Sequence, residues 1–141
     1  MVDREKVERK IQKLDELLDI LEKLSKISSN ELVKDPIKLG SIKYYLQVSI
    51  ESCIDMANHI ISSERFRAPK DYGDTFNILS EEGIIGDNFT QVMKQMVKFR
   101  NRIVHLYDEV DDHYVIDILK NRLDDFQTFR NTILKFLEKN N

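Results

Sequence analysis

Apolar residues recur at helical spacing along almost the whole of this chain. Near its start, an apolar residue follows every four or three positions, which places one face of an α-helix in a core: Val7, Ile11, Leu14, Leu18 and Leu21. No segment alternates between apolar and polar residues as a half-exposed β-strand does. Only four glycines and two prolines interrupt 141 residues. The pattern therefore predicts long helices and an all-α fold.

Four long helices and one short helix are expected. The long ones cover about residues 3–25, 35–63, 89–107 and 111–139, and the short one covers about 72–82. Asp35 followed by Pro36 is typical of a helix start, and residues 28–30 are typical of a break. We expect an antiparallel four-helix bundle with an additional short helix, formed as a single domain by residues 1–141.

The composition limits the classes of function. Charged residues make up 33% and hydrophobic residues 41%, as in a globular protein, and no apolar run is long enough to span a membrane. The first residues, Met-Val-Asp-Arg-Glu-Lys, do not form a signal peptide, so we expect a cytoplasmic location. One cysteine and three scattered histidines predict no metal site. Cys53 and His59 lie on or beside the apolar face of the second helix and are interpreted as packing residues.

Basic residues are concentrated in two places, although the net charge of −3 argues weakly against a general nucleic-acid binder. Residues 89–107 contain no acid and four bases, namely Lys94, Lys98, Arg100 and Arg102. A second cluster contains Arg65, Arg67 and Lys70, opposed only by Glu64. The candidates for steering RNA are Lys94, Lys98, Arg102, Arg65 and Arg67. By charge alone, an ordinary solvated helix face is the favoured interpretation.

The stretch from Arg100 to Tyr107 has the richest chemistry in the sequence. An arginine can hold a phosphate through two hydrogen bonds, and a histidine such as His105 can move a proton near neutral pH. On a helix, Arg100 and Tyr107 fall on one line, Asn101 and His105 fall on a neighbouring line, and Arg102 points away. The alternative is structural, because cations favour a helix C-terminus and a tyrosine often lies at a boundary.

The pattern Arg-Asn-x-x-x-His-x-Tyr, formed here by Arg100, Asn101, His105 and Tyr107, resembles the signature of the HEPN superfamily and more narrowly its HepT toxins. The Gly-Asp-Asn-Phe sequence before this helix, the Leu-Tyr-Asp-Glu-Val sequence at its end and a long final helix are similar as well. The resemblance covers nearly all of the chain.

This resemblance implies a helical homodimer whose two motif helices face each other across a cleft. It implies a metal-independent endoribonuclease toxin without a cofactor, in which Arg100, Asn101 and His105 are catalytic. It also implies a partner, a minimal nucleotidyltransferase (MNT) antitoxin, which can transfer AMP to Tyr107. One histidine cannot easily serve as both general base and general acid, which is a chemical reason for pairing two chains.

Two other readings of the sequence stay open. A non-catalytic HEPN module would use the same cleft to bind a nucleotide or to dock a nucleotidyltransferase, and His105 would have no catalytic duty. A metabolic enzyme is a distant third, because the sequence has no glycine-rich phosphate loop and no nucleophile triad.

Overall fold

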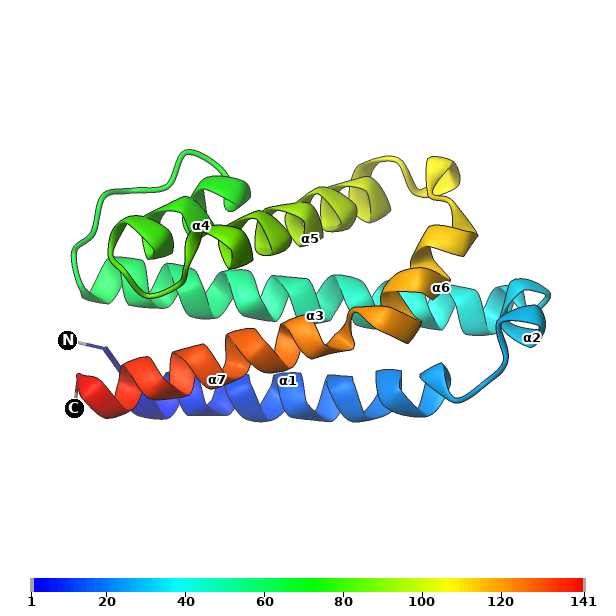
Figure 1. The fold of residues 1–141 in the computed structure, drawn as a ribbon, viewed down its shortest axis with the longest axis horizontal. Helices are drawn as coiled ribbons and strands as arrows, with labels where there is room; N and C mark the ends of the chain where they lie inside the picture. Colours follow the sequence, from blue (N-terminus) through cyan, green and yellow to red (C-terminus); the bar gives the residue numbers. More distant parts are fainter. Residues whose placement is uncertain (1, 141) are drawn as a thin grey trace.

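The computed structural model describes residues 2–140, and in this range it is all-helical (Figure 1). The elements are α1 (Arg4–Ser25), α2 (Ser29–Val33), α3 (Pro36–Ser63), α4 (Tyr72–Glu81), α5 (Asp87–His105), the 3₁₀ helix η1 (Tyr107–Glu109), α6 (Asp112–Asn121) and α7 (Leu123–Lys139). The predicted fold class is confirmed. The four long helices of the bundle are α1, α3, α5 and α7, and α4 is the expected short one.

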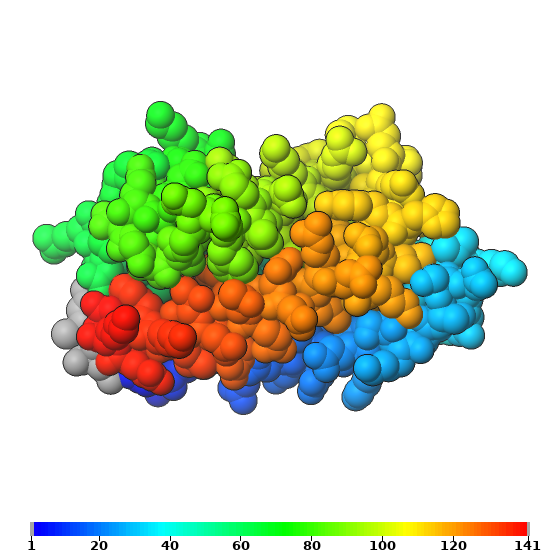
Figure 2. Space-filling model, in the orientation of Figure 1, coloured from blue at the N-terminus to red at the C-terminus, as the bar shows by residue number. Residues whose placement is uncertain are grey.

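The longest helix, α3, runs through the middle of the molecule (Figure 1). It contacts α1 and α7 on one side and α4 and α5 on the other, and consecutive long helices run in opposite directions. Figure 2 shows one face of the bundle, with α4 and α5 along one edge and α6 and α7 below them. Because α3 contacts α5, residues of α3 can hold side chains of α5 in position.

Aspartates define most of the helix starts. Asp3, Asp35, Asp71 and Asp111 each precede a helix, and each side chain accepts a hydrogen bond from a backbone N–H of the first turn. Gly83, which follows α4, has a φ of 73°, a conformation that glycine adopts without strain. These local signals explain why the predicted starts of α1, α3 and α4 lie within one residue of the observed ones.

The apolar faces of all seven α-helices meet in one continuous core. Its largest fully buried side chains are aromatic: Phe76 from α4 and Phe126 and Phe129 from α7. Phe76 and Phe129 meet edge to face with ring centroids 5.7 Å apart, and this contact joins α4 to α7. Cys53 is a free cysteine whose side chain is fully buried, and burial raises its pKa. The expected packing role therefore agrees with the structure.

Three elements differ from the sequence prediction. The predicted break after α1 contains a short helix, α2, which Ser28 caps and which Leu32 anchors in the core. The predicted final helix is divided at Arg122, so α6 crosses the end of the bundle and α7 runs along α1 (Figure 1). Lys120 on α6 donates to the carbonyl oxygens of Ser25 and Ile27 at the end of α1, which holds α6 in this crossing position.

The third difference affects the motif. The helix predicted to reach Tyr107 ends at His105, where Leu106 leaves the helical conformation, and Tyr107 begins η1. The prediction that Arg100 and Tyr107 share one helical line is therefore wrong. Side-chain contacts with α3, described below, determine where Tyr107 lies.

Candidate functional site

Arg100 is held in place by the middle of α3. Its Nε donates to Oε2 of Glu51 at 2.9 Å, and its Nη2 forms an ion pair with the same carboxylate oxygen at 2.7 Å. Nη1 donates to the side-chain oxygen of Asn101 at 3.1 Å, and the ring of Tyr72 lies 5.2 Å from the guanidinium carbon. The side chain of Arg100 is only 15% exposed. Its position is thus determined by α3, α4 and its own helix together.

These contacts leave part of the guanidinium available. Arginine has five N–H donors, and the hydrogen bonds to Glu51 and Asn101 use two of them, one on Nε and one on Nη1. The other N–H groups, on Nη1 and Nη2, make no further hydrogen bond within residues 2–140, although Nη2 also takes part in the ion pair with Glu51. A small cavity of about 230 Å³ lies beside Arg100, Glu51 and Tyr72. The arrangement can bind one phosphate oxygen without releasing Glu51.

His105 is the last residue of α5, and its side chain is exposed. Within residues 2–140 it makes no side-chain hydrogen bond or ion pair, so both ring nitrogens can meet a substrate. Lys94, Lys98, Asn101 and His105 follow one another at intervals of four, three and four residues. That spacing places them in one row along α5, with His105 at its end. The row connects the candidate proton-transfer residue with two lysines.

Tyr107 lies against the N-terminal half of α3. The Nζ atom of Lys43 is 4.6 Å from the centre of its ring, and its hydroxyl is near Gly40, where an added Cβ would be 3.9 Å away. Tyr107 nevertheless remains 48% exposed. The ring is fixed by a cation–π contact while the phenol group stays accessible to a reagent.

Lys43 is itself unusual, because only 8% of it is exposed. Its Nζ forms an ion pair of 3.0 Å with Asp112, the first residue of α6. The sequence reasoning missed both Lys43 and Glu51. A signal was present, since Lys43, Gln47 and Glu51 form a polar row, four residues apart, on a helix that is otherwise largely apolar. In the structure this row lies beside the C-terminal half of α5.

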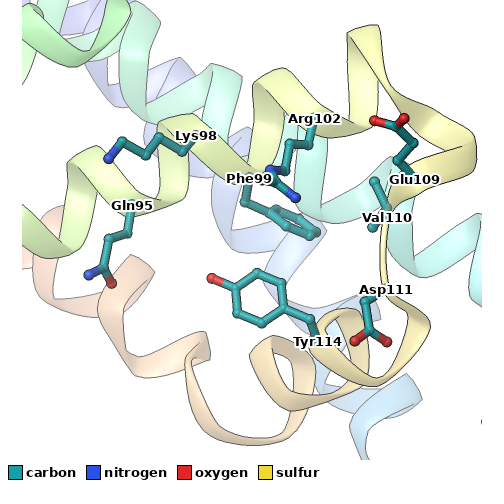
Figure 3. Close-up of a pocket in the computed structure, with 8 residues that line it drawn as sticks. All are labelled: Gln95, Lys98, Phe99, Arg102, Glu109, Val110, Asp111 and Tyr114. Atoms are coloured by element: carbon teal, nitrogen blue, oxygen red, sulfur yellow. The ribbon is translucent and has the colours of Figure 1, made fainter.

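The other predicted basic residues are distributed over two regions. Lys94, Lys98 and Asn101 line a groove of about 370 Å³ between α5 and the start of α4. Lys98 and Arg102 also line a second hollow on the opposite side of the row, where α5 meets α6 (Figure 3). Lys98 therefore lies on the ridge between two concave surfaces.

Arg65 and Arg67 lie away from this row. They follow the end of α3, about 18 Å along the helix axis from Glu51. Arg67 is paired with both Asp74 and Glu81, and hydrogen bonds to these carboxylates raise its pKa. This network connects the 65–72 segment to α4. A role of Arg65 and Arg67 in steering RNA stays a prediction, and the structure does not bring them to the motif.

His59 is a packing residue, as expected. Its Nε2 accepts a hydrogen bond of 3.2 Å from the backbone N–H of Asp3, which joins α3 to the start of α1. Partial burial, followed by the nearby charge of Lys6, lowers its pKa. No group of three histidine, cysteine, aspartate or glutamate side chains within residues 2–140 is arranged as a metal site. No helix in the same range is long and apolar enough to cross a membrane.

The profile of the family described as "Ribonuclease HepT-like" matches residues 7–133, which is nearly the whole chain. This chain belongs to the ribonuclease HepT-like family. The family resemblance inferred from the motif is therefore correct, and Arg100, His105 and Tyr107 all lie inside the HepT-like match.

Individual HepT-like relatives agree with this membership. The mRNA nuclease HepT of Shewanella oneidensis is 33% identical over 93 residues, which cover 66% of this chain and 70% of the relative. A protein of Archaeoglobus fulgidus, provisionally named an RNase, is 30% identical over 131 residues, which cover 93% of this chain and 92% of the relative.

A solved structure extends the comparison to a complex. It contains the tri-AMPylated HEPN toxin of Shewanella oneidensis bound to its MNT antitoxin. The match to this chain has a TM-score of 0.87 and 27% identity, and it covers 96% of this chain and 99% of the other. The HepT-like fold is thus shared over nearly the full length of both chains.

Proposed function

We propose that this protein is a metal-independent endoribonuclease, the toxin of a toxin–antitoxin pair, and that it acts in the cytoplasm as a homodimer. The observation that carries this proposal is Arg100, a guanidinium fixed by Glu51 whose Nη1 and Nη2 groups still have N–H donors outside any hydrogen bond within residues 2–140, on the same helix as an exposed His105. Membership of the HepT-like family and the nuclease names of its relatives support the same activity.

The proposed reaction is an internal transfer at one phosphodiester. The 2′-oxygen of RNA forms a bond to phosphorus while the P–O5′ bond breaks, which leaves a 2′,3′-cyclic phosphate and a 5′-hydroxyl. A neutral His105 accepts the proton of the 2′-hydroxyl, and a protonated histidine donates one to the leaving O5′. Arg100 stabilises the negative charge on the phosphate oxygens, and Asn101 holds the Arg100 side chain.

Two protonation states require two histidines, so the partner subunit's His105 supplies the second. Exposed apolar side chains beside the motif support a dimer at this face, since such a surface favours association. They come from the N-terminal part of α3 and from the end of α5, namely Ile37, Tyr44, Val104 and Leu106. Ile37 is the most exposed of them, at 83%, so covering it in an interface removes the largest fraction of apolar side-chain surface from water.

We propose Tyr107 as the acceptor of AMP from an MNT-type antitoxin. Its phenol is exposed, and its ring is held by Lys43. The tri-AMPylated state of the similar Shewanella toxin supports modification of this kind. An added AMP places negative charge and bulk beside the motif, where an RNA backbone has to bind, and so inhibits the enzyme.

The test is cleavage of total RNA in the presence of a metal chelator by the wild-type protein and by His105→Ala. We expect wild type to produce fragments that end in a cyclic phosphate, and His105→Ala to produce none. Equal cleavage by both proteins would remove His105 from the mechanism. Saturable nucleotide or antitoxin binding without any RNA turnover would instead favour a non-catalytic module.

A further inference from the structure

A hollow next to the motif helix is not part of the Arg100 site. It measures about 510 Å³ and lies between α5 and the chain that leads from η1 into α6 (Figure 3). Eight residues line it: Gln95, Lys98, Phe99, Arg102, Glu109, Val110, Asp111 and Tyr114. Arg102 is three residues before His105, about 4.5 Å along the helix axis. A strand that passes His105 reaches this hollow with a neighbouring nucleotide.

An aromatic ring forms one wall of the hollow. Tyr114 is 44% exposed, and it meets the buried Phe99 edge to face, with centroids 5.7 Å apart and planes at 64°. In Figure 3 the two rings lie one above the other, with the Tyr114 hydroxyl directed toward the side of Gln95. The contact with Phe99 fixes the ring and leaves part of it open. A fixed, accessible aromatic ring is a stacking surface for an unpaired base.

The charges around this ring are separated. Lys98 and Arg102 lie on the α5 side, and within residues 2–140 neither is paired with a carboxylate. Glu109 and Asp111 lie on the other side, where Asp111 also accepts a hydrogen bond from the backbone N–H of His113. An acidic peptide or a free phosphate would meet repulsion from these two carboxylates. A suitable ligand carries an anionic group at one end and N–H donors at the other.

A nucleotide with an amino-bearing base meets this description. Its phosphate contacts Lys98 and Arg102, its base stacks on Tyr114, and its exocyclic amine donates to Glu109 or Asp111. We propose that this hollow is a base-binding subsite for single-stranded RNA, holding the nucleotide next to the cleaved bond and favouring adenine, cytosine or guanine over uracil. The assignment of RNA as the ligand rests on the proposed function.

The experiment measures binding without cleavage. Fluorescently labelled oligonucleotides with 2′-O-methyl sugars cannot be cut, and three of equal length carry only adenine, only cytosine or only uracil. Anisotropy gives their affinities for wild type, Tyr114→Leu and Tyr114→Phe. Leucine keeps the apolar contact with Phe99 but has no flat ring, whereas phenylalanine keeps both. We expect Tyr114→Leu to weaken binding of the adenine and cytosine strands about tenfold, and Tyr114→Phe to bind them within about twofold of wild type.

A second variant tests base preference. Glu109→Ala should reduce the advantage of the adenine and cytosine strands over the uracil strand. Equal affinities of Tyr114→Leu and wild type would overturn the subsite. If Tyr114→Leu instead weakened antitoxin binding and not oligonucleotide binding, the hollow would be a protein-docking surface, which also overturns it.

Failure of this subsite and failure of the proposed function give different results. A wild-type protein that cleaves RNA while Tyr114→Leu cleaves and binds identically would contradict the subsite alone. A wild-type protein that cleaves nothing, but binds adenine strands through Tyr114, would contradict the nuclease and keep the subsite.

Discussion

Glu51 and Arg100 lie 49 residues apart in the sequence, yet a single oxygen of the glutamate accepts a hydrogen bond from Nε of the arginine and forms an ion pair with its Nη2. The pair fixes the guanidinium on α5 from the neighbouring helix α3. A charge that stabilises a reacting phosphate works best when it is already in position before substrate binds. Glu51 is therefore a positioning residue for the proposed reaction, and it acts through Arg100.

Replacing Glu51 should impair cleavage without abolishing the fold. We expect Glu51→Ala to lower kcat/KM for RNA by about 10- to 100-fold, because a displaced catalytic group costs rates of this order. Glu51→Asp, which keeps the charge on a shorter side chain, should recover part of the loss. Gln47→Ala is the matched control, since Gln47 contacts Glu51 but not Arg100. Unchanged kcat/KM in Glu51→Ala, beside an inactive Arg100→Ala, would show that the ion pair has no part in catalysis.

Tyr107 gives a prediction about control by the antitoxin. Tyr107→Phe keeps the ring beneath Lys43 and removes the hydroxyl that would accept AMP. We expect this variant to stay toxic when an MNT-type antitoxin is co-expressed, whereas the wild-type toxin is neutralised. Growth of the co-expressing cells is the measurement, and intact-protein mass gives the AMP content. Complete neutralisation of Tyr107→Phe would indicate inhibition by complex formation instead.

Replacing Lys43 should slow the transfer of AMP to Tyr107 more than it slows the cleavage of RNA. Lys43→Met keeps most of the side-chain volume, removes the cation over Tyr107 and leaves Asp112 without its partner at 3.0 Å. We expect AMP transfer to Tyr107 to slow by about threefold to tenfold, in line with the loss of one cation–π contact. RNA cleavage by the unmodified variant should change less. Lys38→Met, on the same helix but paired with Glu31 and Asp35, is a suitable control.

His59 predicts how stability depends on pH. Its pKa is lowered in the folded protein, so the unfolded chain binds the proton more tightly. The contribution of His59 is fully present above its unfolded pKa of about 6.5 and is lost as the pH falls through that value toward the folded pKa. Urea midpoints at pH 7.5 and pH 5.5 should therefore differ less in His59→Gln than in wild type. An identical difference in both proteins would assign the pH dependence to other groups.

Replacing Phe129 tests how much its contact with Phe76 on α4 stabilises the fold. Phe129 is fully buried and meets Phe76 edge to face, so Phe129→Ala leaves a large cavity in the core. We expect the free energy of unfolding to fall by about 3–5 kcal/mol, as for other buried phenylalanines. Chemical denaturation followed by circular dichroism measures this change. Phe136→Ala, at a partly buried position of the same helix, should cost less.

The sequence alone determined the all-α fold class, the starts of three helices and the chemistry of the motif. Apolar residues at intervals of three and four, together with Asp35, Pro36 and the other cap residues, act over a few neighbouring positions, so the starts of α1, α3 and α4 were predictable. The grouping of Arg100, Asn101, His105 and Tyr107 is equally local, and it was enough to indicate the HepT-like family.

Only the tertiary structure decided which of these side chains are held and by what. The end of α5 at His105, the position of Tyr107 under Lys43 and the bond from Arg100 to Glu51 all depend on how α3 packs against α5. The hollow at Tyr114 likewise needs α6 to cross the bundle after a turn that the periodicity does not reveal. Helical periodicity reports which face of a segment is buried, but it does not report which residues of another helix lie opposite that face.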